Sequence, residues 1–440
     1  MTKFRIIKSR ADSLVRLGAY STIATPNIII PTSRGTIPHL TPENVQKHVE
    51  TPAVFVGLED FIERVPMKSP IAQFGHSLRE YISLLPSSHE IPIFLAPRRS
   101  CPIPTSQQNS DKTFSIVTTD GFRQFEVIEY LTLASTLADK DTVILAPVDM
   151  PMLISTTKSE GGYSPWKHIG GNRVRKMVVR NEMWSEAALQ ICAARDVIVP
   201  IMPGIKLPDQ EEFINKVAVS SAGLTFYDIS SPFVPESCAE KLTSPMTGSS
   251  ADIASLPESI STFARINLAY HNGPHDVLES IAKGYDLFCA DWVVTATDAG
   301  IAFTFELEQT SDETLPLGIS LWENVKYATD LNSLSDDCEC HTCKNHHRAY
   351  IAHLLSAKEM LAWTLLQIHN LHVASKFMAQ IRSAIEQNQF DEASRKFNKT
   401  YSAKTQATPG GGPRVRGYQV RLAGLVTDKK LNESPFRSLD

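Results

Sequence analysis

Residues 338–347 read CECHTCKNHH, and this stretch places three cysteines within six residues. Cys338, Cys340 and Cys343 offer three soft thiolate ligands, and a tetrahedral zinc ion needs one more. Thiolates favour zinc over magnesium or calcium, and an iron–sulfur cluster would normally need a fourth cysteine nearby, whereas none follows Cys343. The alternative is a set of free, buried cysteines. The pattern predicts one bound zinc ion.

The fourth ligand is expected to be a histidine, and spacing alone does not choose it. His341 lies inside the thiol loop and is expected to point away from the metal, whereas a later residue such as His369 would hold a helix against the loop. Three cysteines and one histidine fill all four coordination positions and leave none for water. The predicted zinc is therefore structural, and catalysis would have to occur elsewhere. The candidates are His341, His346, His347, His353, His369 and His372.

Composition is that of an ordinary globular protein, with 42% hydrophobic and 21% charged residues in a chain of 440. The first ten residues lack the apolar core of a signal peptide, and no run approaches the roughly 18 apolar residues of a membrane span. Seven cysteines, three of them together, do not resemble a disulfide framework. These features predict a cytoplasmic protein without an integral membrane segment.

Charge is unevenly distributed along the chain. Residues 338–440 contain 15 Lys and Arg against 8 Asp and Glu, although the whole chain has a net charge of −5. This basic C-terminal quarter is consistent with a nucleic-acid-binding face or with an ordinary solvated helix surface.

Short apolar strands alternate with amphipathic helical patterns over much of the chain. Strands that are apolar throughout indicate a parallel sheet buried on both faces. The number of these units favours a closed (β/α)₈ (TIM) barrel, and an open doubly wound sheet is the alternative. The expected strands are residues 113–120 (TFSIVTTD), 142–149 (TVILAPVD), 196–204 (DVIVPIMPG), 223–230 (GLTFYDIS), 263–270 (FARINLAY) and 286–294 (DLFCADWVV).

Three divisions of the chain follow from these patterns. Residues 1–330 are expected to form the barrel, with Ser-, Pro- and Thr-rich inserts near 100–112 and 235–259. Residues 331–400 are expected to form a zinc-binding helical subdomain. Residues 401–440 are expected to be a tail that includes the glycine run 410–412.

Aspartates end several of the predicted strands. Asp120, Asp149, Asp228 and Asp291 would lie at the carboxyl ends of their strands, where a barrel carries its active site. Such carboxylates could bind the donor edge of a purine or act as nucleophile or general base. Each is otherwise an ordinary turn residue or helix cap.

The cysteine loop, the helical pattern RAYIAHLLSAKEMLAW and the following IHNLH resemble the C-terminal signature of the tRNA-guanine transglycosylases. The resemblance extends to residues 16–41, to RNEMW at 180–184, to AGLTFYD at 222–228 and to a closing helix at 381–397. It implies a (β/α)₈ barrel with a zinc subdomain, and it selects His369 as the fourth zinc ligand. Members of this family replace guanine at the wobble position of certain tRNAs through a covalent tRNA–aspartate intermediate.

The chain departs from this family where the nucleophile is expected. That aspartate directly follows an Asp-hydrophobic-Phe triplet, and here Cys289 follows Asp286-Leu287-Phe288. Asp291 would share a strand face with Cys289 but lie about 6–7 Å further along. Because a misplacement of 1 Å can cost about 100-fold in rate, Asp291 is not expected to replace the nucleophile.

The base-binding residues are only partly retained. Met202-Pro203-Gly204 stands where the family has Val-Gln-Gly, and Asp120-Gly121-Phe122-Arg123-Gln124 is interpreted as a shortened Asp-Ser-Gly-Gly-Phe-Gln loop. Asp149 stands where the base-recognising aspartate is expected. Asp120, Asp149 and Gly223 are therefore the candidate base-binding residues.

This pattern resembles the non-catalytic accessory members of the eukaryotic queuine tRNA-ribosyltransferases. The resemblance implies a heterodimer with a catalytic subunit, tRNA as partner, and guanine-to-queuine exchange in tRNAs with GUN anticodons (Asp, Asn, His and Tyr). It also implies possible peripheral association with the mitochondrial outer membrane. The rival interpretation is a self-sufficient transglycosylase whose nucleophile has moved to Asp291 or Asp120.

Overall fold

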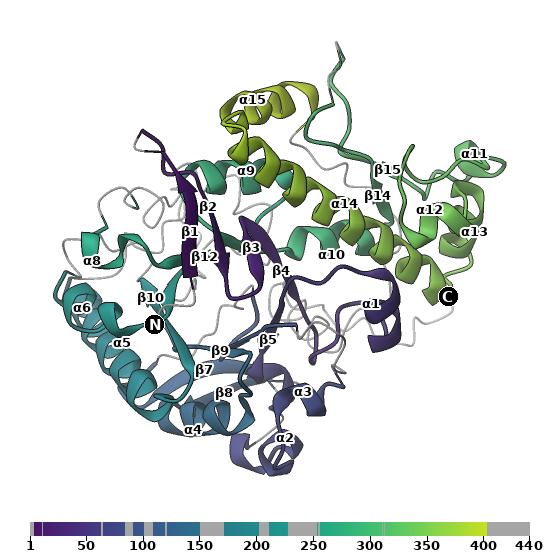
Figure 1. Cartoon of the computed structure of the whole chain (residues 1–440). Helices are drawn as coiled ribbons and strands as arrows, with labels where there is room; N and C mark the ends of the chain where they lie inside the picture. The colour runs from purple at the N-terminus through teal and green to yellow at the C-terminus, as the bar shows by residue number, and fades with distance from the viewer. Residues whose placement is uncertain are drawn as a thin grey trace, which may run out of the picture.

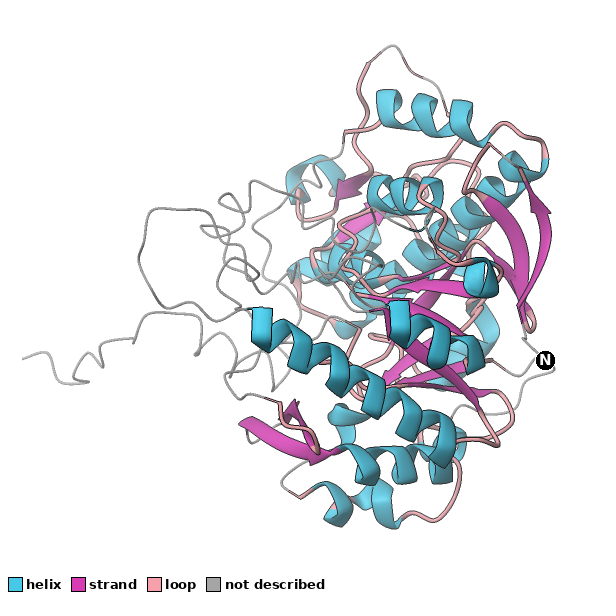
Figure 2. Ribbon diagram, turned by 90° about the vertical axis from the view of Figure 1, so that its left-hand side faces the viewer, coloured by secondary structure: helices cyan, strands magenta, loops and turns pink. Residues whose placement is uncertain are grey.

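The computed structural model describes residues 4–10, 12–62, 65–83, 91–100, 109–118, 121–149, 171–201, 211–227, 253, 256–309, 311 and 313–402. Eight parallel strands form a closed barrel, as the alternating pattern predicts (Figures 1 and 2). In chain order around the barrel they are β4 (Asn27–Pro31), β5 (Val54–Gly57), β6 (Ile93–Ala96), β9 (Thr142–Leu145), β10 (Asp196–Ile201), β11 (Gly223–Phe226), β12 (Ala264–Asn267) and β13 (Leu287–Cys289).

Alternation of side chains explains why these strands are apolar throughout. In β4, Ile29 packs in the cluster that fills the barrel, whereas Ile28 and Ile30 pack in the larger cluster between strands and helices. Since both faces are buried, the side chains on both are mainly apolar. The helices of this part of the chain are α1 (Pro42–His48), α2 (Pro70–Gln73), α3 (Leu78–Tyr81), α4 (Val127–Leu137), α5 (Gly171–Ile191), α6 (Glu211–Lys216), α8 (Glu258–Ser261), α9 (Pro274–Ala282) and α10 (Asp291–Asp298), with short 3₁₀ turns at Leu58–Phe61, Pro66–Lys68 and Ala218–Ser220.

One predicted barrel strand is wrong. Residues 113–118 form β7 (Thr113–Thr118), which pairs antiparallel with β8 (Gly121–Glu126) in a hairpin outside the barrel. Gly121 adopts φ = 105°, a conformation that glycine accommodates and that helps the chain reverse here. The third barrel strand is instead β6, so β6, β5 and β4 supply the strands that the sequence pattern did not identify.

This correction also changes the interpretation of residues 120–124. The family loop expected there should follow a barrel strand, but residues 121–124 belong to β8 of the hairpin. Residues 97–100 follow the third barrel strand instead. Asp120 itself lies outside the described residues.

A three-stranded antiparallel sheet covers the amino end of the barrel. It consists of β1 (Phe4–Ser9), β2 (Arg16–Tyr20) and β3 (Ile23–Thr25), and Phe4, Tyr20 and Ile23 join the cluster inside the barrel. Figure 1 shows these strands beside β4 and β12.

The C-terminal part is built around one long helix. α14 (Met360–Glu386) has 27 residues and packs against α10, α12, α13 and β14. The other elements are β14 (Ile301–Phe303), β15 (Gly318–Ser320), α11 (Asn324–Tyr327), α12 (His341–Asn345), α13 (Arg348–Ser356) and α15 (Phe390–Thr400). The helical pattern RAYIAHLLSAKEMLAW (348–363) thus spans α13 and the start of α14, and the predicted closing helix spans the end of α14 and α15. Positive φ angles at Lys358 (57°) and Asn388 (60°) mark the two breaks.

The boundary at residue 330 stays a prediction. A separate hydrophobic cluster contains Ala302, Leu321 and Tyr327, which precede this position in the chain, and also Leu334 and Trp363, among others, which follow it. Packing therefore continues across the proposed boundary.

A buried ion pair fastens β2 to the amino end of the barrel. Arg16 and Asp286 are 5% and 0% exposed, and Nε of Arg16 donates to Oδ1 of Asp286 at 2.8 Å. Arg16 also donates to the carbonyl of Ser261 at 2.9 Å, and the backbone N–H of Arg265 donates to Oδ2 of Asp286 at 2.7 Å. These four groups are therefore held in one network.

We expect Asp286→Asn to lower the free energy of unfolding by about 3–5 kcal/mol, because it leaves the buried guanidinium of Arg16 without a counter-charge. Urea denaturation followed by circular dichroism measures this. Asp12→Asn, which breaks the exposed Arg10–Asp12 pair, is the control and should leave the midpoint unchanged. A loss below about 1 kcal/mol for Asp286→Asn would show that the network does not brace the barrel.

Candidate metal centre and barrel mouth

Four side chains of the C-terminal part converge on one point. Cys338, Cys340, Cys343 and His369 each offer one ligand atom, and these atoms lie within 4.8 Å of one another. The distances from Nδ1 of His369 to the three Sγ atoms are 3.6, 3.6 and 3.4 Å, in the order Cys338, Cys340 and Cys343. The residues therefore form a candidate metal-binding cluster.

Local structure holds each ligand in place. Cys340 is the N-cap of α12, and Cys343 lies within that helix, so one turn brings two thiols together. His369 is buried on α14, where its Nε2–H donates to the carbonyl oxygen of Phe303 at 2.7 Å. This bond fixes the ring so that Nδ1 faces the thiols, which is the usual support for a metal-bound histidine.

The spacing fits a tetrahedral ion. Metal–sulfur bonds of about 2.3 Å and metal–nitrogen bonds of about 2.0–2.1 Å at a tetrahedral angle place sulfur and nitrogen about 3.6 Å apart. The observed 3.4–3.6 Å matches this value. The cluster is consistent with structural zinc, because four protein ligands leave no open position.

The other candidate histidines lie away from this cluster. His341 stacks on His48 of α1 with ring centroids 3.9 Å apart, and His346 stacks on Tyr350 at 5.3 Å. His353 is exposed on α13. His369 is the only one of the six candidates in the four-residue group that the described part of the chain contains.

We expect His369→Ala to lose most of the bound metal and to lower the free energy of unfolding by more than about 4 kcal/mol, since it removes a ligand and the bond to Phe303. Metal content by plasma mass spectrometry and thermal unfolding with and without chelator measure both effects. Exposed His353→Ala is the matched control and should behave like the unmodified protein. Normal metal content in His369→Ala would exclude this ligand.

Cys289 ends β13 inside the barrel. It is 1% exposed and packs in the inner cluster. Burial, and secondarily the nearby carboxylate of Asp291, raises the pKa of this thiol well above its usual range. Cys289 is therefore a protonated thiol at neutral pH, which makes it a poor nucleophile.

Asp291 does not continue the strand. The backbone turns at Ala290 (φ −92°, ψ 43°), and Asp291 is the first residue of α10. The expectation that Asp291 lies further along the same strand face is therefore wrong, since β13 ends at Cys289. Oδ1 of Asp291 accepts a hydrogen bond from the hydroxyl of Ser100 at 2.7 Å, so this carboxylate is engaged at the mouth of the barrel.

We expect native Cys289 to resist iodoacetamide at pH 8, because alkylation requires the thiolate and burial raises the pKa of this thiol. Its labelling in the folded protein should be at least about 100-fold slower than in the urea-unfolded protein, because burial both disfavours the thiolate and keeps the reagent away from it. Peptide mass spectrometry measures both rates on the same residue. Equal rates would show an accessible, ionised thiol.

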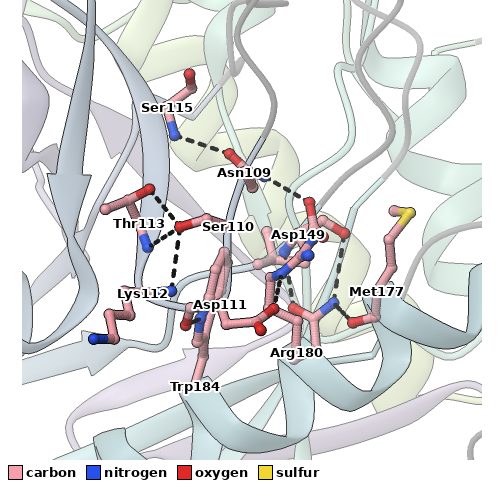
Figure 3. Close-up of polar contacts among 12 residues, drawn as sticks. Asn109, Ser110, Asp111, Lys112, Thr113, Ser115, Asp149, Met177, Arg180 and Trp184 are labelled. Atoms are coloured by element: carbon pink, nitrogen blue, oxygen red, sulfur yellow. Dashed lines mark hydrogen bonds and ion pairs between the residues drawn. The ribbon is translucent and has the colours of Figure 1, made fainter. Parts of the chain in front are cut away.

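Asp149 lies at the mouth of the barrel, four residues beyond β9, and both of its carboxylate oxygens are engaged. Oδ1 accepts from Nδ2 of Asn109 at 2.6 Å, and Oδ2 forms an ion pair with Arg180 of α5 (Figure 3). The backbone N–H of Asp149 donates to Oδ1 of Asn181 at 2.8 Å. A purine base bound here would have to displace Asn109 or Arg180.

Gly223 does not lie beside Asp149. It is the first residue of β11, at the amino end of its strand, and an added Cβ would lie 3.2 Å from the carbonyl oxygen of Ala264. Asp149, by contrast, lies beyond the carboxyl end of β9. Residues 202–204, Asp120 and Asp228 lie outside the described residues.

Arginines at the mouth were missed in the sequence analysis. Arg98 and Arg99 follow β6, and Arg99 pairs with Glu59 at 2.8 Å and with Asp60 at 2.6 Å. The available signal was Pro97-Arg98-Arg99 directly after the apolar run IFLA, because paired charges that follow a buried strand lie at its carboxyl end.

A family model described as queuine tRNA-ribosyltransferase matches residues 163–403. The accessory subunit 2 of queuine tRNA-ribosyltransferase from Schizosaccharomyces pombe (strain 972 / ATCC 24843) is 33% identical over 417 residues, which cover 92% of this chain and 84% of that protein. The chain belongs to the queuine tRNA-ribosyltransferase family.

Two further members show where the similarity lies. The accessory subunit 2 from Anopheles gambiae is 26% identical over 84% of this chain and 82% of its own length. The queuine tRNA-ribosyltransferase of Psychrobacter cryohalolentis is 37% identical, but over only 31% of this chain and 33% of its own. Similarity to the two accessory subunits therefore spans most of the chain, whereas this bacterial protein matches one segment.

Membrane insertion through a helix has no support in the described residues. None of their helices combines the length and the hydrophobicity that a transmembrane span requires.

Proposed function

We propose that this chain is a non-catalytic subunit of a queuine tRNA-ribosyltransferase that supports exchange of guanine for queuine in tRNAs with GUN anticodons. The observation that carries this proposal is Cys289. It stands directly after the Asp-Leu-Phe triplet, where the family's aspartate nucleophile is expected, and it is buried and protonated. A role as nucleophile or general base would need an ionised group at this position.

The engaged carboxylates give independent support. Asp291 opens a helix and accepts from Ser100, and Asp149 is held by Asn109 and Arg180. Both groups already have partners within the chain. Two relatives that match most of the chain are named accessory subunits, which agrees with a role that lacks chemistry of its own.

We propose that the cluster of Cys338, Cys340, Cys343 and His369 holds one structural zinc ion. Three thiolates and one imidazole are the donor set of closed zinc sites, and their spacing fits tetrahedral geometry. When bound, zinc would fasten the cysteine loop to α14.

The proposed partners are the catalytic subunit and tRNA. The surface around the metal cluster would dock onto the catalytic subunit, and basic residues of the C-terminal part would contact phosphates. Among these, Arg348 pairs with Asp330 and exposed Lys396 pairs with Glu392, whereas exposed Lys344 and Lys399 form no ion pair with the described residues. Lys344 and Lys399 are therefore the preferred tRNA contacts, followed by Arg395.

The proposed location is the cytoplasm, with any association with the mitochondrial outer membrane being peripheral. The rival function is a self-sufficient transglycosylase that uses Asp291 or Asp120. The rival is retained because the carboxylate of Asp291 lies at the barrel mouth, two residues after Cys289 in the chain.

A base-exchange assay with labelled guanine and a wobble-guanine tRNA separates the two functions. We expect the purified chain alone to be at least about 1000-fold slower than a mixture with the catalytic subunit, because it lacks the nucleophile. The mixture should keep its rate with Asp291→Ala and lose it with Cys338→Ser, which disrupts the metal cluster.

Cys192→Ser is the control for Cys338→Ser, because Cys192 is a buried cysteine outside the metal cluster. Exchange by the chain alone that disappears in Asp291→Ala would establish the rival function. Exchange by the chain alone that survives Asp291→Ala would point to Asp120, which Asp120→Ala tests.

A further inference from the structure

Arg98 carries a buried charge that the described residues do not neutralise. Arg98 comes two residues after the end of β6, at the mouth of the barrel, and it is only 5% exposed. No carboxylate of the described residues lies within ion-pair distance of it. Its Nη2 atom is buried and makes no hydrogen bond to any described residue. A guanidinium in this state has lost its water and gained no counter-ion, which is costly.

The remaining atoms of this guanidinium are held firmly. Nε donates to the carbonyl oxygen of Ser115 at 2.8 Å, and Nη1 donates to the carbonyl oxygen of Val148 at 3.0 Å. The ring of Phe114 lies beneath it, with Cζ 5.3 Å from the ring centroid. Two carbonyls and one ring therefore fix the direction in which Nη2 presents its two N–H donors.

The two carbonyls are themselves fixed by the network in Figure 3. The N–H of Ser115 donates to Oδ1 of Asn109 at 2.9 Å, and Asn109 in turn donates to Asp149. The N–H of Asp149, next to Val148, donates to Asn181. The site around Arg98 is thus assembled in advance, which lowers the entropic cost of binding a ligand.

Neighbouring carboxylates are already used by other donors. Oε1 of Glu59 accepts from Arg99, and its Oε2 accepts from the N–H of Val117 at 3.0 Å. Asp149 is neutralised by Arg180. These two acids attract the charge of Arg98 from a distance, but each is paired with another arginine and neither forms an ion pair with Arg98.

We infer that the mouth of this barrel binds an oxyanion, a phosphate or carboxylate group, through Nη2 of Arg98. A water molecule could accept one hydrogen bond there but would leave the charge unbalanced, whereas an oxyanion supplies both acceptor and charge. Arg173, Arg175 and Lys176, exposed in the first turns of α5 ahead of Arg180, would raise the local concentration of anions. The site is independent of the proposed function, because it requires neither base exchange nor a partner subunit.

Isothermal titration calorimetry of the full chain with inorganic phosphate and, separately, with acetate tests this inference at constant ionic strength set by chloride. We expect saturable binding of at least one of the two anions. Arg98→Lys should weaken it at least about 10-fold, because an ammonium group cannot hold both carbonyls and still present a free donor. The matched control is Arg79→Lys, an arginine that pairs with Asp139 and should leave affinity unchanged.

A second measurement, made on the unmodified protein, tests the inference even if the Arg98→Lys variant misfolds. In the unmodified protein, phosphate or acetate should slow the reaction of Arg98 with phenylglyoxal, measured by peptide mass spectrometry, and leave that of Arg79 unchanged. Absence of saturable binding for both anions, or equal affinity in folded Arg98→Lys, would overturn the inference. If tRNA competes with phosphate, the natural anion is an RNA phosphate; if it does not, the site takes a small ligand.

Discussion

The C-terminal part of the molecule depends on one imidazole ring. His369 presents Nδ1 to three thiols and uses Nε2 to bind the carbonyl of Phe303, so a single side chain ties the cysteine loop, α14 and β14 together. Its neighbour Asn370 extends this connection, because it accepts from the N–H of Phe303 at 2.9 Å and donates to the carbonyl of Ile301 at 2.9 Å. The position of α14 against the barrel is thus coupled to the metal cluster.

The two ends of the barrel use buried charge in different ways. At the amino end, Arg16 and Asp286 satisfy one another and join β2 to β13. At the carboxyl end, Arg99 pairs with Glu59 and Asp60, and Arg180 pairs with Asp149. The amino end is therefore braced by an ion pair, although Nε of buried Arg265 makes no hydrogen bond to the described residues. The carboxyl end, where this fold carries its sites, contains a buried arginine, Arg98, without an ion-pair partner in the described part of the chain.

The barrel and the three clustered cysteines could be predicted because each rests on local chemistry, whereas His369 was selected only by the family resemblance. A strand that is apolar throughout indicates burial on both faces, and three cysteines within six residues indicate a shared metal ion. The hairpin at β7 and β8 was misassigned because Phe114 and Ile116 are as buried as a barrel strand, and burial alone does not give the direction of pairing. The arginine network was missed since Arg99 and its partner Glu59 are 40 residues apart in the chain, and no local pattern joins them.

The burial of Cys289 limits which substitutions this position can accept. The codons for cysteine and aspartate differ at two positions, so a change to aspartate by single steps would pass through glycine or tyrosine. At a site that is 1% exposed, glycine leaves a void and tyrosine does not fit the closely packed barrel interior. Each single step would therefore lower the stability of the fold. Packing around one small side chain thus separates cysteine from aspartate at this position by destabilised intermediates.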